Sequence, residues 1–182
     1  MSDSPVSSNW LIREATPADA AGIALVHVDS WRSTYAGIMP ATLLEGMTYA
    51  DREEMWIKRL SNPENPNPLL VAKDDQGRIV GFAAAGPERT NRPDYGAEVY
   101  AIYLLEAEQG AGIGKALFRE AASRLREMGY DSVLVWVARD NPACGFYEAL
   151  GGVLIDEKEE EYGGRAIKLV AYGWQGLGDL PD

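Results

Sequence analysis

The stretch at residues 97–128 constrains the fold more than any other part of this chain. An apolar run at residues 99–105 (VYAIYLL) is followed by residues 109–114 (QGAGIG) and then by an amphipathic segment that reaches Met128. This succession predicts a strand, a glycine-rich turn and a helix. Glycines let the backbone approach a ligand closely, and the first N–H groups of a helix have no partner within it. We therefore expect an anion-binding site at the turn.

The spacing of the glycines excludes two common anion sites. A phosphate loop of the NTPase kind requires G-x-x-x-x-G-K-[ST], but Gln109 stands at the first glycine and Ala116 at the hydroxyl position. The dinucleotide fingerprint G-x-G-x-x-G, read from Gly110, requires glycine where Lys115 stands, and no βαβ unit is expected at the N-terminus to host it. The pattern that remains is Q-x-x-G-x-G.

This pattern resembles the acyl-CoA pyrophosphate loop of the GNAT N-acetyltransferase superfamily. A second segment, residues 141–152 (NPACGFYEALGG), is similar to the family's N-x-x-A-x-x-F-Y-x-x-L-G-F helix. Residues 12–19 and 26–35 are similar to bacterial members, some of them grouped with polyamine acetyltransferases. Two positions depart from the pattern. Ala111 replaces a frequent basic residue, which implies a modest affinity for coenzyme A, and Gly152 replaces an aromatic residue, which implies looser packing.

The order of expected elements agrees with this resemblance over residues 11–174. Helices are expected at residues 16–35, 50–60, 113–128 and 142–150. Strands are expected at residues 11–13, 69–73, 79–85, 97–105, 132–138, 153–155 and 166–174. We predict an α+β protein with the GNAT fold, in which helices flank both faces of a mixed, mostly antiparallel sheet. Residues 10–175 would form a single domain between a disordered tail (1–9) and a second tail (176–182).

Composition limits the partners of the chain. Its 182 residues carry a net charge of −11, which argues against nucleic acid and tolerates a cationic amine. No apolar run approaches the ~20 residues of a membrane span, and no secretory signal is recognisable. A single cysteine, Cys144, and a single histidine, His27, exclude an internal disulfide and a cysteine- or multi-histidine metal site. We expect a cytoplasmic protein without a metal and without a nucleic-acid or membrane partner.

The resemblance implies a set of residues that bind acetyl-CoA. The end of the central strand would contact the acetyl and pantetheine parts, and the glycine turn with the following lysine would hold the pyrophosphate. Asn141 would either bind the pantetheine or cap the helix that follows it. The implied set is Ile102, Tyr103, Leu104, Gln109, Gly110, Ala111, Gly112, Ile113, Gly114, Lys115 and Asn141.

Acetyl transfer to an amine also requires proton transfers. Tyr147 is the expected general acid, because a phenol with a pKa of ~10 stays protonated at neutral pH and can donate to the departing thiolate. The alternative is a tyrosine that only packs on the sheet. Glu98 could accept the proton of the amine, or it could be a carboxylate that faces solvent at the end of a strand.

Two aromatic residues of the first helix are expected to form a wall of the acceptor pocket. Trp31 and Tyr35 are four residues apart and share a helix face. They could hold an alkyl or cationic amine through cation–π contacts, or they could pack on the core. His27 is expected to be structural. The acidic run at residues 156–161 is interpreted as a solvated hairpin tip, and a weaker hypothesis is that it attracts a polycationic acceptor.

These observations predict an acetyl-CoA-dependent N-acetyltransferase. It would transfer the acetyl group to a primary amine of a small molecule by direct attack, without a covalent enzyme intermediate. Two alternatives stay open: a non-catalytic acyl-CoA-binding or regulatory module, and an acetyltransferase of peptide or protein N-termini. The resemblance also allows a homodimer through the C-terminal strands, although no residue requires it.

Overall fold

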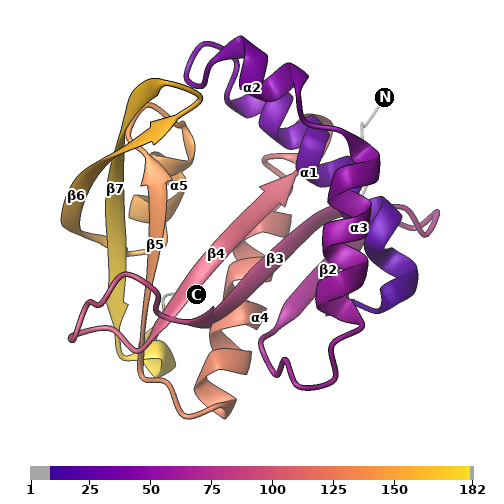
Figure 1. Ribbon diagram of the computed structural model, residues 1–182. Helices are drawn as coiled ribbons and strands as arrows, with labels where there is room; N and C mark the ends of the chain where they lie inside the picture. The colour runs from indigo at the N-terminus through magenta and orange to yellow at the C-terminus, as the bar shows by residue number, and fades with distance from the viewer. Residues whose placement is uncertain (1–8, 181–182) are drawn as a thin grey trace, which may run out of the picture.

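Seven strands form one mixed sheet in the computed structural model, which describes residues 9–180 (Figure 1). Their spatial order is β1-β2-β3-β4-β5-β7-β6, and only the β4–β5 pair is parallel. The strands are β1 (Leu11–Glu14), β2 (Leu69–Lys73), β3 (Ile79–Pro87), β4 (Ala97–Leu104), β5 (Ser132–Ala138), β6 (Val153–Tyr162) and β7 (Arg165–Gln175). The predicted mixed, mostly antiparallel sheet is confirmed. The tail predicted at residues 1–9 lies, apart from residue 9, outside the described residues.

Helices cover both faces of the sheet. The helices α1 (Ala20–Thr34) and α3 (Tyr49–Leu60) pack on one face, where Ile23, Trp56 and Phe82 are buried together. The helices α4 (Ile113–Glu127) and α5 (Ala143–Ala149) pack on the other, around Phe118 and Leu125. A short helix, α2 (Ala41–Glu45), follows the loop after α1 and was not predicted. Within the described residues no helix is long and apolar enough to cross a membrane.

The first helix begins at a polar junction that the sequence indicates. A 3-10 turn, Pro17–Asp19, leads into α1. The Asp19 carboxylate accepts hydrogen bonds from the Thr16 backbone N–H at 2.8 Å and from the Arg13 guanidinium at 2.7 and 2.8 Å. The arginine is the main reason that the pKa of Asp19 falls from 3.8 to about 2. These bonds fix the direction in which α1 leaves β1, and so help to position its far end at the site described below.

Two segments near the C-terminus differ from their predicted structure. The acidic run is not a hairpin tip: it lies inside β6, which continues to Tyr162 and turns at Gly163 and Gly164. In the segment predicted as the second tail, Leu177–Asp179 form a 3-10 turn, and Leu177 is buried in the core that α4 covers.

Gly152 does not loosen the packing as predicted. A Cβ atom at this position would lie 2.6 Å from the Trp174 ring and 2.8 Å from the Tyr147 carbonyl oxygen. Trp174 fills the space and donates from its indole nitrogen to the Leu150 carbonyl at 2.9 Å. An aromatic side chain from β7 thus occupies the space, so the missing aromatic residue leaves no cavity.

The strands β4 and β5 separate soon after they begin, and this separation creates the site. They pair only at Ala97 with Val133 and at Glu98 with Leu134. Beyond these pairs β4 remains joined to β3, with an irregular register around Tyr100, while β5 remains joined to β7. Figure 1 shows the two strands diverging toward the end of the sheet near α2. The second half of β4 therefore presents backbone groups that β5 does not bind.

Candidate active site

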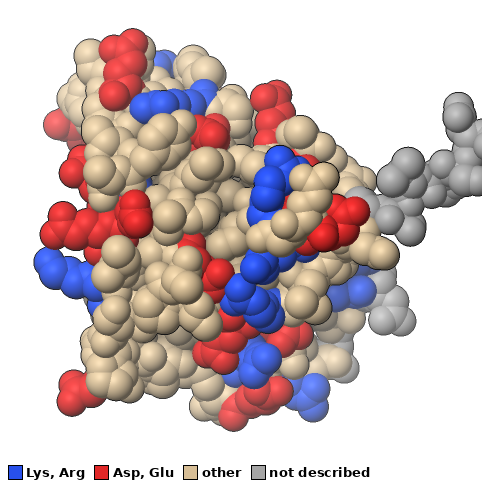
Figure 2. Space-filling view, turned by 90° about the vertical axis from the view of Figure 1, so that its right-hand side faces the viewer, with Lys and Arg blue, Asp and Glu red and all other residues tan. Residues whose placement is uncertain are grey.

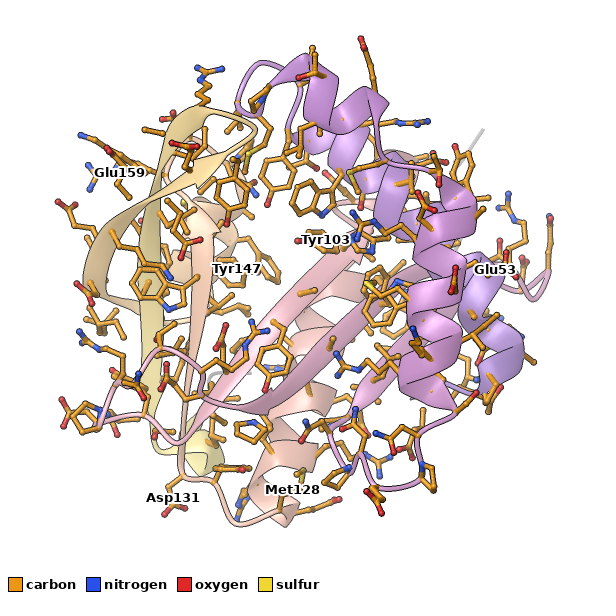
Figure 3. The ribbon with its side chains drawn as sticks, in the orientation of Figure 1. Glu53, Tyr103, Met128, Asp131, Tyr147 and Glu159 are labelled. Carbon is orange, nitrogen blue, oxygen red and sulfur yellow. The ribbon has the colours of Figure 1, made fainter. Side chains whose placement is uncertain are left out.

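A cavity of about 550 Å³ lies where β4 and β5 separate. It runs from the glycine turn before α4, along the second half of β4, to the start of α5. Figure 3 shows Tyr103 of β4 and Tyr147 of α5 on opposite sides of this space. Most of the residues predicted to bind the cofactor line this cavity, namely Ile102, Tyr103, Leu104, Gln109, Gly110, Gly112, Gly114, Lys115 and Asn141.

Two residues of the glycine turn adopt the left-handed backbone conformation. Gly110 and Gly112 have φ angles of +80° and +85°, which side chains other than glycine rarely tolerate. A Cβ atom at either position would meet nothing within 4 Å, so the backbone conformation, and not lack of space, accounts for glycine there. Gly112 is the N-cap of α4, and the unpaired N–H groups of the first helical turn lie at the cavity.

Two predicted residues of the turn do not line the cavity. Ala111 is exposed at the tip of the turn, and the Ile113 side chain is buried in the core. Their contribution to a bound ligand is therefore limited to their backbone N–H groups. Lys115 is the basic side chain among the residues that line the cavity.

Tyr147 lines the same cavity and is 5% exposed. Its ring packs edge-on against Phe146 and Trp174, with centroid distances of 5.1 and 6.1 Å. Burial, and to a lesser degree the nearby Tyr35 and Cys144, raises the pKa of the Tyr147 phenol above 10. The phenol is therefore held protonated at neutral pH.

Asn141 makes the capping bond that was one of its two predicted roles. Its side-chain oxygen accepts from the Ala143 N–H at 2.8 Å, at the start of α5. Its side-chain nitrogen donates to the Tyr35 hydroxyl at 3.4 Å. The residue also lines the cavity. Capping α5 and binding a pantetheine are therefore compatible roles for Asn141.

The aromatic side chains of α1 form a cluster between the helix and β4. The Trp31 and Tyr35 rings are 4.6 Å apart, and His27 stacks on Tyr103 at 5.7 Å. The His27 Nδ1 atom accepts from the Trp56 indole N–H at 3.2 Å. Burial is the main reason that the pKa of His27 falls from 6.5 to about 4. His27 is thus an uncharged packing residue at neutral pH.

A second cavity, of about 420 Å³, opens on the side of β4 that faces α1. Trp31 and Glu98 line this cavity and not the first, whereas Tyr35 lines both. Glu98 is 3% exposed and does not face solvent. Its carboxylate accepts from the Arg89 guanidinium at 2.8 and 3.3 Å and from the Arg89 N–H at 3.2 Å.

Sequence reasoning did not identify several residues that line these cavities. Phe146 lines the first, and Arg89, Thr90, Trp136, Lys158, Glu160 and Tyr162 line the second. Arg89 and Thr90 come from a polar loop with no recognisable motif. Lys158 and Glu160 come from the run that was interpreted as a hairpin tip, and Tyr162 follows it directly. The two-residue periodicity of a strand was the only available signal, and charged residues obscured it.

The comparison with known proteins agrees with this geometry. The model of the acetyltransferase (GNAT) family matches residues 28–152, more than half of the chain. The chain belongs to this family. It is an N-acetyltransferase, as the predicted resemblance implied, and the family uses acetyl-CoA as its acyl donor.

Individual relatives extend the likeness over most of the chain. The uncharacterized N-acetyltransferase YuaI of Bacillus subtilis (strain 168) is 40% identical over 169 residues, which are 93% of this chain and 95% of that protein. The L-methionine sulfoximine/L-methionine sulfone acetyltransferase of Pseudomonas aeruginosa is 26% identical and covers 77% of this chain and 78% of that protein. The crystal structure of PaiA N-acetyltransferase from Thermoplasma acidophilum with coenzyme A has a TM-score of 0.68 at 22% identity, over 92% and 99% of the two chains. This last likeness shows the fold.

Proposed function

We propose that this GNAT enzyme binds acetyl-CoA in the first cavity and transfers the acetyl group to a primary amine of a small molecule by direct attack. The observation that carries the proposal is that one cavity joins the glycine turn at the start of α4 to Tyr147 at the opening between β4 and β5. An acyl-CoA needs both an anion site and, some distance away, a proton donor for its sulfur.

The residues present fit such a cofactor. The left-handed glycines and the N-terminus of α4 offer N–H groups to a pyrophosphate, and Lys115 adds one positive charge. A chain with a net charge of −11 would repel an anionic ligand at long range. Aimed backbone groups offset that repulsion at the turn. The backbone groups of Ile102 to Leu104 that face away from β3, and that β5 does not pair with, would bind the pantetheine and acetyl parts.

Acetyl-CoA supplies an activated thioester when bound. The reaction forms a C–N bond, breaks the C–S bond, removes a proton from the amine and returns one to sulfur. Tyr147 would donate the latter proton, because it lines the same cavity and a phenol is protonated at neutral pH. Glu98 would accept the former through water, with Arg89 fixing the orientation of its carboxylate.

The acceptor would enter through the second cavity. Trp31 and Tyr35 form part of its wall, and Tyr35 also lines the first cavity. A small molecule suits a cavity of about 420 Å³. The relative from Pseudomonas aeruginosa, named for two small methionine derivatives, supports this class of acceptor.

Replacement of Tyr147 by phenylalanine tests the proposal. Tyr147→Phe should lower kcat by roughly 10²-fold or more and leave the Kd of acetyl-CoA nearly unchanged, because the ring still packs on Trp174. Tyr172→Phe is a matched control, since its ring lies 6.2 Å from that of Tyr147 while its hydroxyl donates to Glu148. A fall in kcat that only follows weaker cofactor binding would contradict the assignment of Tyr147.

A further inference from the structure

The strand β6 forms one wall of the second cavity. Alternate residues of a strand face opposite sides of the sheet, and Lys158, Glu160 and Tyr162 line the cavity while Glu159 and Glu161 are exposed. The register agrees, because Lys158 lies opposite Leu169 and Glu160 opposite Ile167, both buried residues of β7. Of the acidic run, Glu160 is the carboxylate that lines the cavity.

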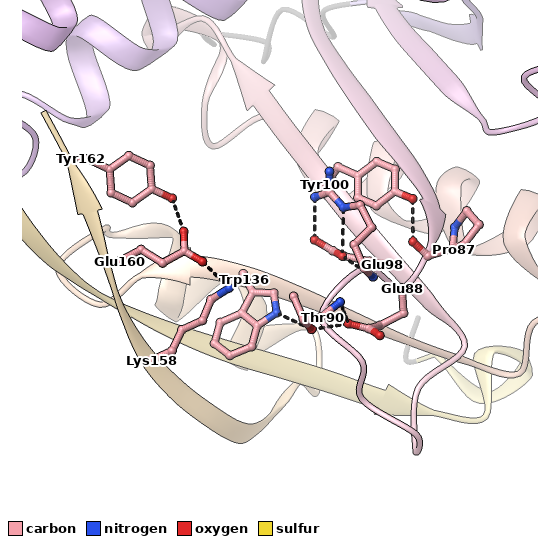
Figure 4. Close-up of polar contacts among 10 residues, drawn as sticks. Pro87, Glu88, Thr90, Glu98, Tyr100, Trp136, Lys158, Glu160 and Tyr162 are labelled. Atoms are coloured by element: carbon pink, nitrogen blue, oxygen red, sulfur yellow. Dashed lines mark hydrogen bonds and ion pairs between the residues drawn. The ribbon is translucent and has the colours of Figure 1, made fainter.

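Lys158 and Glu160 form an ion pair inside this wall. The Lys158 Nζ atom lies 2.5 Å from Glu160 Oε1 and 4.3 Å from the centroid of the Trp136 ring. The Tyr162 hydroxyl donates to the other Glu160 oxygen at 3.0 Å (Figure 4). The hydrogen bond from the lysine lowers the pKa of Glu160, so that this carboxylate is ionised at neutral pH.

The opposite wall carries a second ion pair. Arg89 pairs with Glu98, and the guanidinium carbon of Arg89 lies 3.7 Å from the centroid of the Tyr100 ring. Figure 4 shows Glu160 and Glu98, one carboxylate from each pair, on opposite sides of Trp136. The cavity is therefore lined by two cations and two carboxylates, with aromatic rings between them.

This arrangement discriminates between classes of amine. A polyamine would bring several positive charges toward Lys158 and Arg89, which electrostatic repulsion disfavours. An uncharged alkyl chain would use only the aromatic rings. A zwitterion matches the pattern, because its carboxylate and its ammonium can each replace one partner of an existing ion pair, so that every charge keeps a partner of opposite sign.

The position of Glu160 relative to the first cavity favours Glu160 as the residue that binds the ammonium group of the acceptor. Tyr162, which donates to Glu160, packs in one cluster with Tyr35 and Tyr103. These two tyrosines line both cavities. An amine held by Glu160 would thus lie on the side from which it can reach the thioester proposed above.

We propose that the acceptor is a zwitterionic amine of the α-amino-acid type, whose carboxylate is bound by Lys158 and whose ammonium is bound by Glu160 before it loses its proton. This inference rests on the proposed acetyl transfer and narrows its acceptor. It also replaces the hypothesis that the acidic run attracts a polycation, because the cavity presents a lysine beside its carboxylate.

Matched pairs of amines test this proposal. The kcat/KM would be measured for methionine, leucine and phenylalanine, for the three amines that correspond to them without the carboxylate, and for spermidine. The wild-type enzyme should prefer at least one amino acid to its decarboxylated partner and to spermidine. Lys158→Met should lower kcat/KM for that amino acid by roughly 10- to 100-fold and leave its decarboxylated partner nearly unaffected.

Two variants separate recognition from folding. Lys158→Arg retains the positive charge and should restore much of the preference. Lys168→Met removes a lysine from the exposed face of the neighbouring strand β7 and should change neither substrate. Equal losses for both members of a pair in Lys158→Met, or a wild-type preference for spermidine or for the decarboxylated amines, would overturn the inference. If acetyl-CoA does not bind, the proposed function itself fails. It also fails if acetyl-CoA binds and neither these amines nor any other small primary amine is acetylated.

Discussion

The backbone conformation of Gly112 offers a direct test of the anion-binding turn. Its φ of +85° costs a residue with a side chain about 1–2 kcal/mol. Gly112→Ala should therefore lower the free energy of unfolding by about that amount, which corresponds to a fall in Tm of roughly 2–8 °C for a chain of this size. No steric clash adds to this cost, because the new Cβ would meet nothing within 4 Å.

The same strain should weaken cofactor binding. When the alanine relaxes out of the left-handed region, the N–H groups at the start of α4 turn away from the cavity. Binding must restore them at the cost of whatever part of the 1–2 kcal/mol the free protein has relieved by relaxing, so the Kd of acetyl-CoA measured by calorimetry should rise by up to roughly 5- to 30-fold.

Gly129 provides the matched control at the opposite end of α4. Its φ is +94°, and a Cβ atom there would also meet nothing within 4 Å. Gly129→Ala should lose similar stability and bind acetyl-CoA as the wild type does. Equal stability losses with equal Kd values in the two variants would refute the assignment of the pyrophosphate to the glycine turn.

Two further predictions concern protonation. Because burial lowers the pKa of His27 from 6.5 to about 4, the unfolded chain binds a proton between these values that the folded chain does not. The free energy of unfolding should therefore fall by roughly 1–3 kcal/mol as the pH drops through this window. Urea denaturation of His27→Gln should show a smaller fall. The same pH dependence in the variant and in the wild type would contradict a buried neutral histidine. Glu98→Gln should lower kcat and alter the pH–rate profile without changing the Kd of acetyl-CoA, whereas reduced stability with an unaltered profile would make Glu98 only an anchor for Arg89.

Local signals were sufficient to predict much of the architecture. The glycine turn, the helices with clear periodicity and the strands bounded by turns were predicted from the chain because each is specified by neighbouring residues. The short helix Ala41–Glu45 was missed since five residues cannot display a helical period. The mixed sheet followed from the order of the elements and from the family resemblance.

Contacts between residues that are distant in the chain could not be predicted from the sequence. The strand β6 was predicted to end early because glutamate and lysine are uncommon in strands, and only its pairing with Ile167 and Leu169 of β7 shows which residues face inward. The space at Gly152 is filled by Trp174, which lies 22 residues away in the chain (174 − 152). Most residues of the glycine motif that line the first cavity were named from the sequence, whereas most residues that several elements bring to the second cavity were not.

Amine-dependent release of coenzyme A tests the central claim most directly. Wild-type protein would first be titrated with acetyl-CoA by calorimetry, and free thiol would then be followed with and without amino acids and other primary amines. We expect saturable binding, and thiol release that requires an amine and yields the N-acetylated product in equal amount. Absence of binding, or binding without acetylation of any amine, would contradict the central claim.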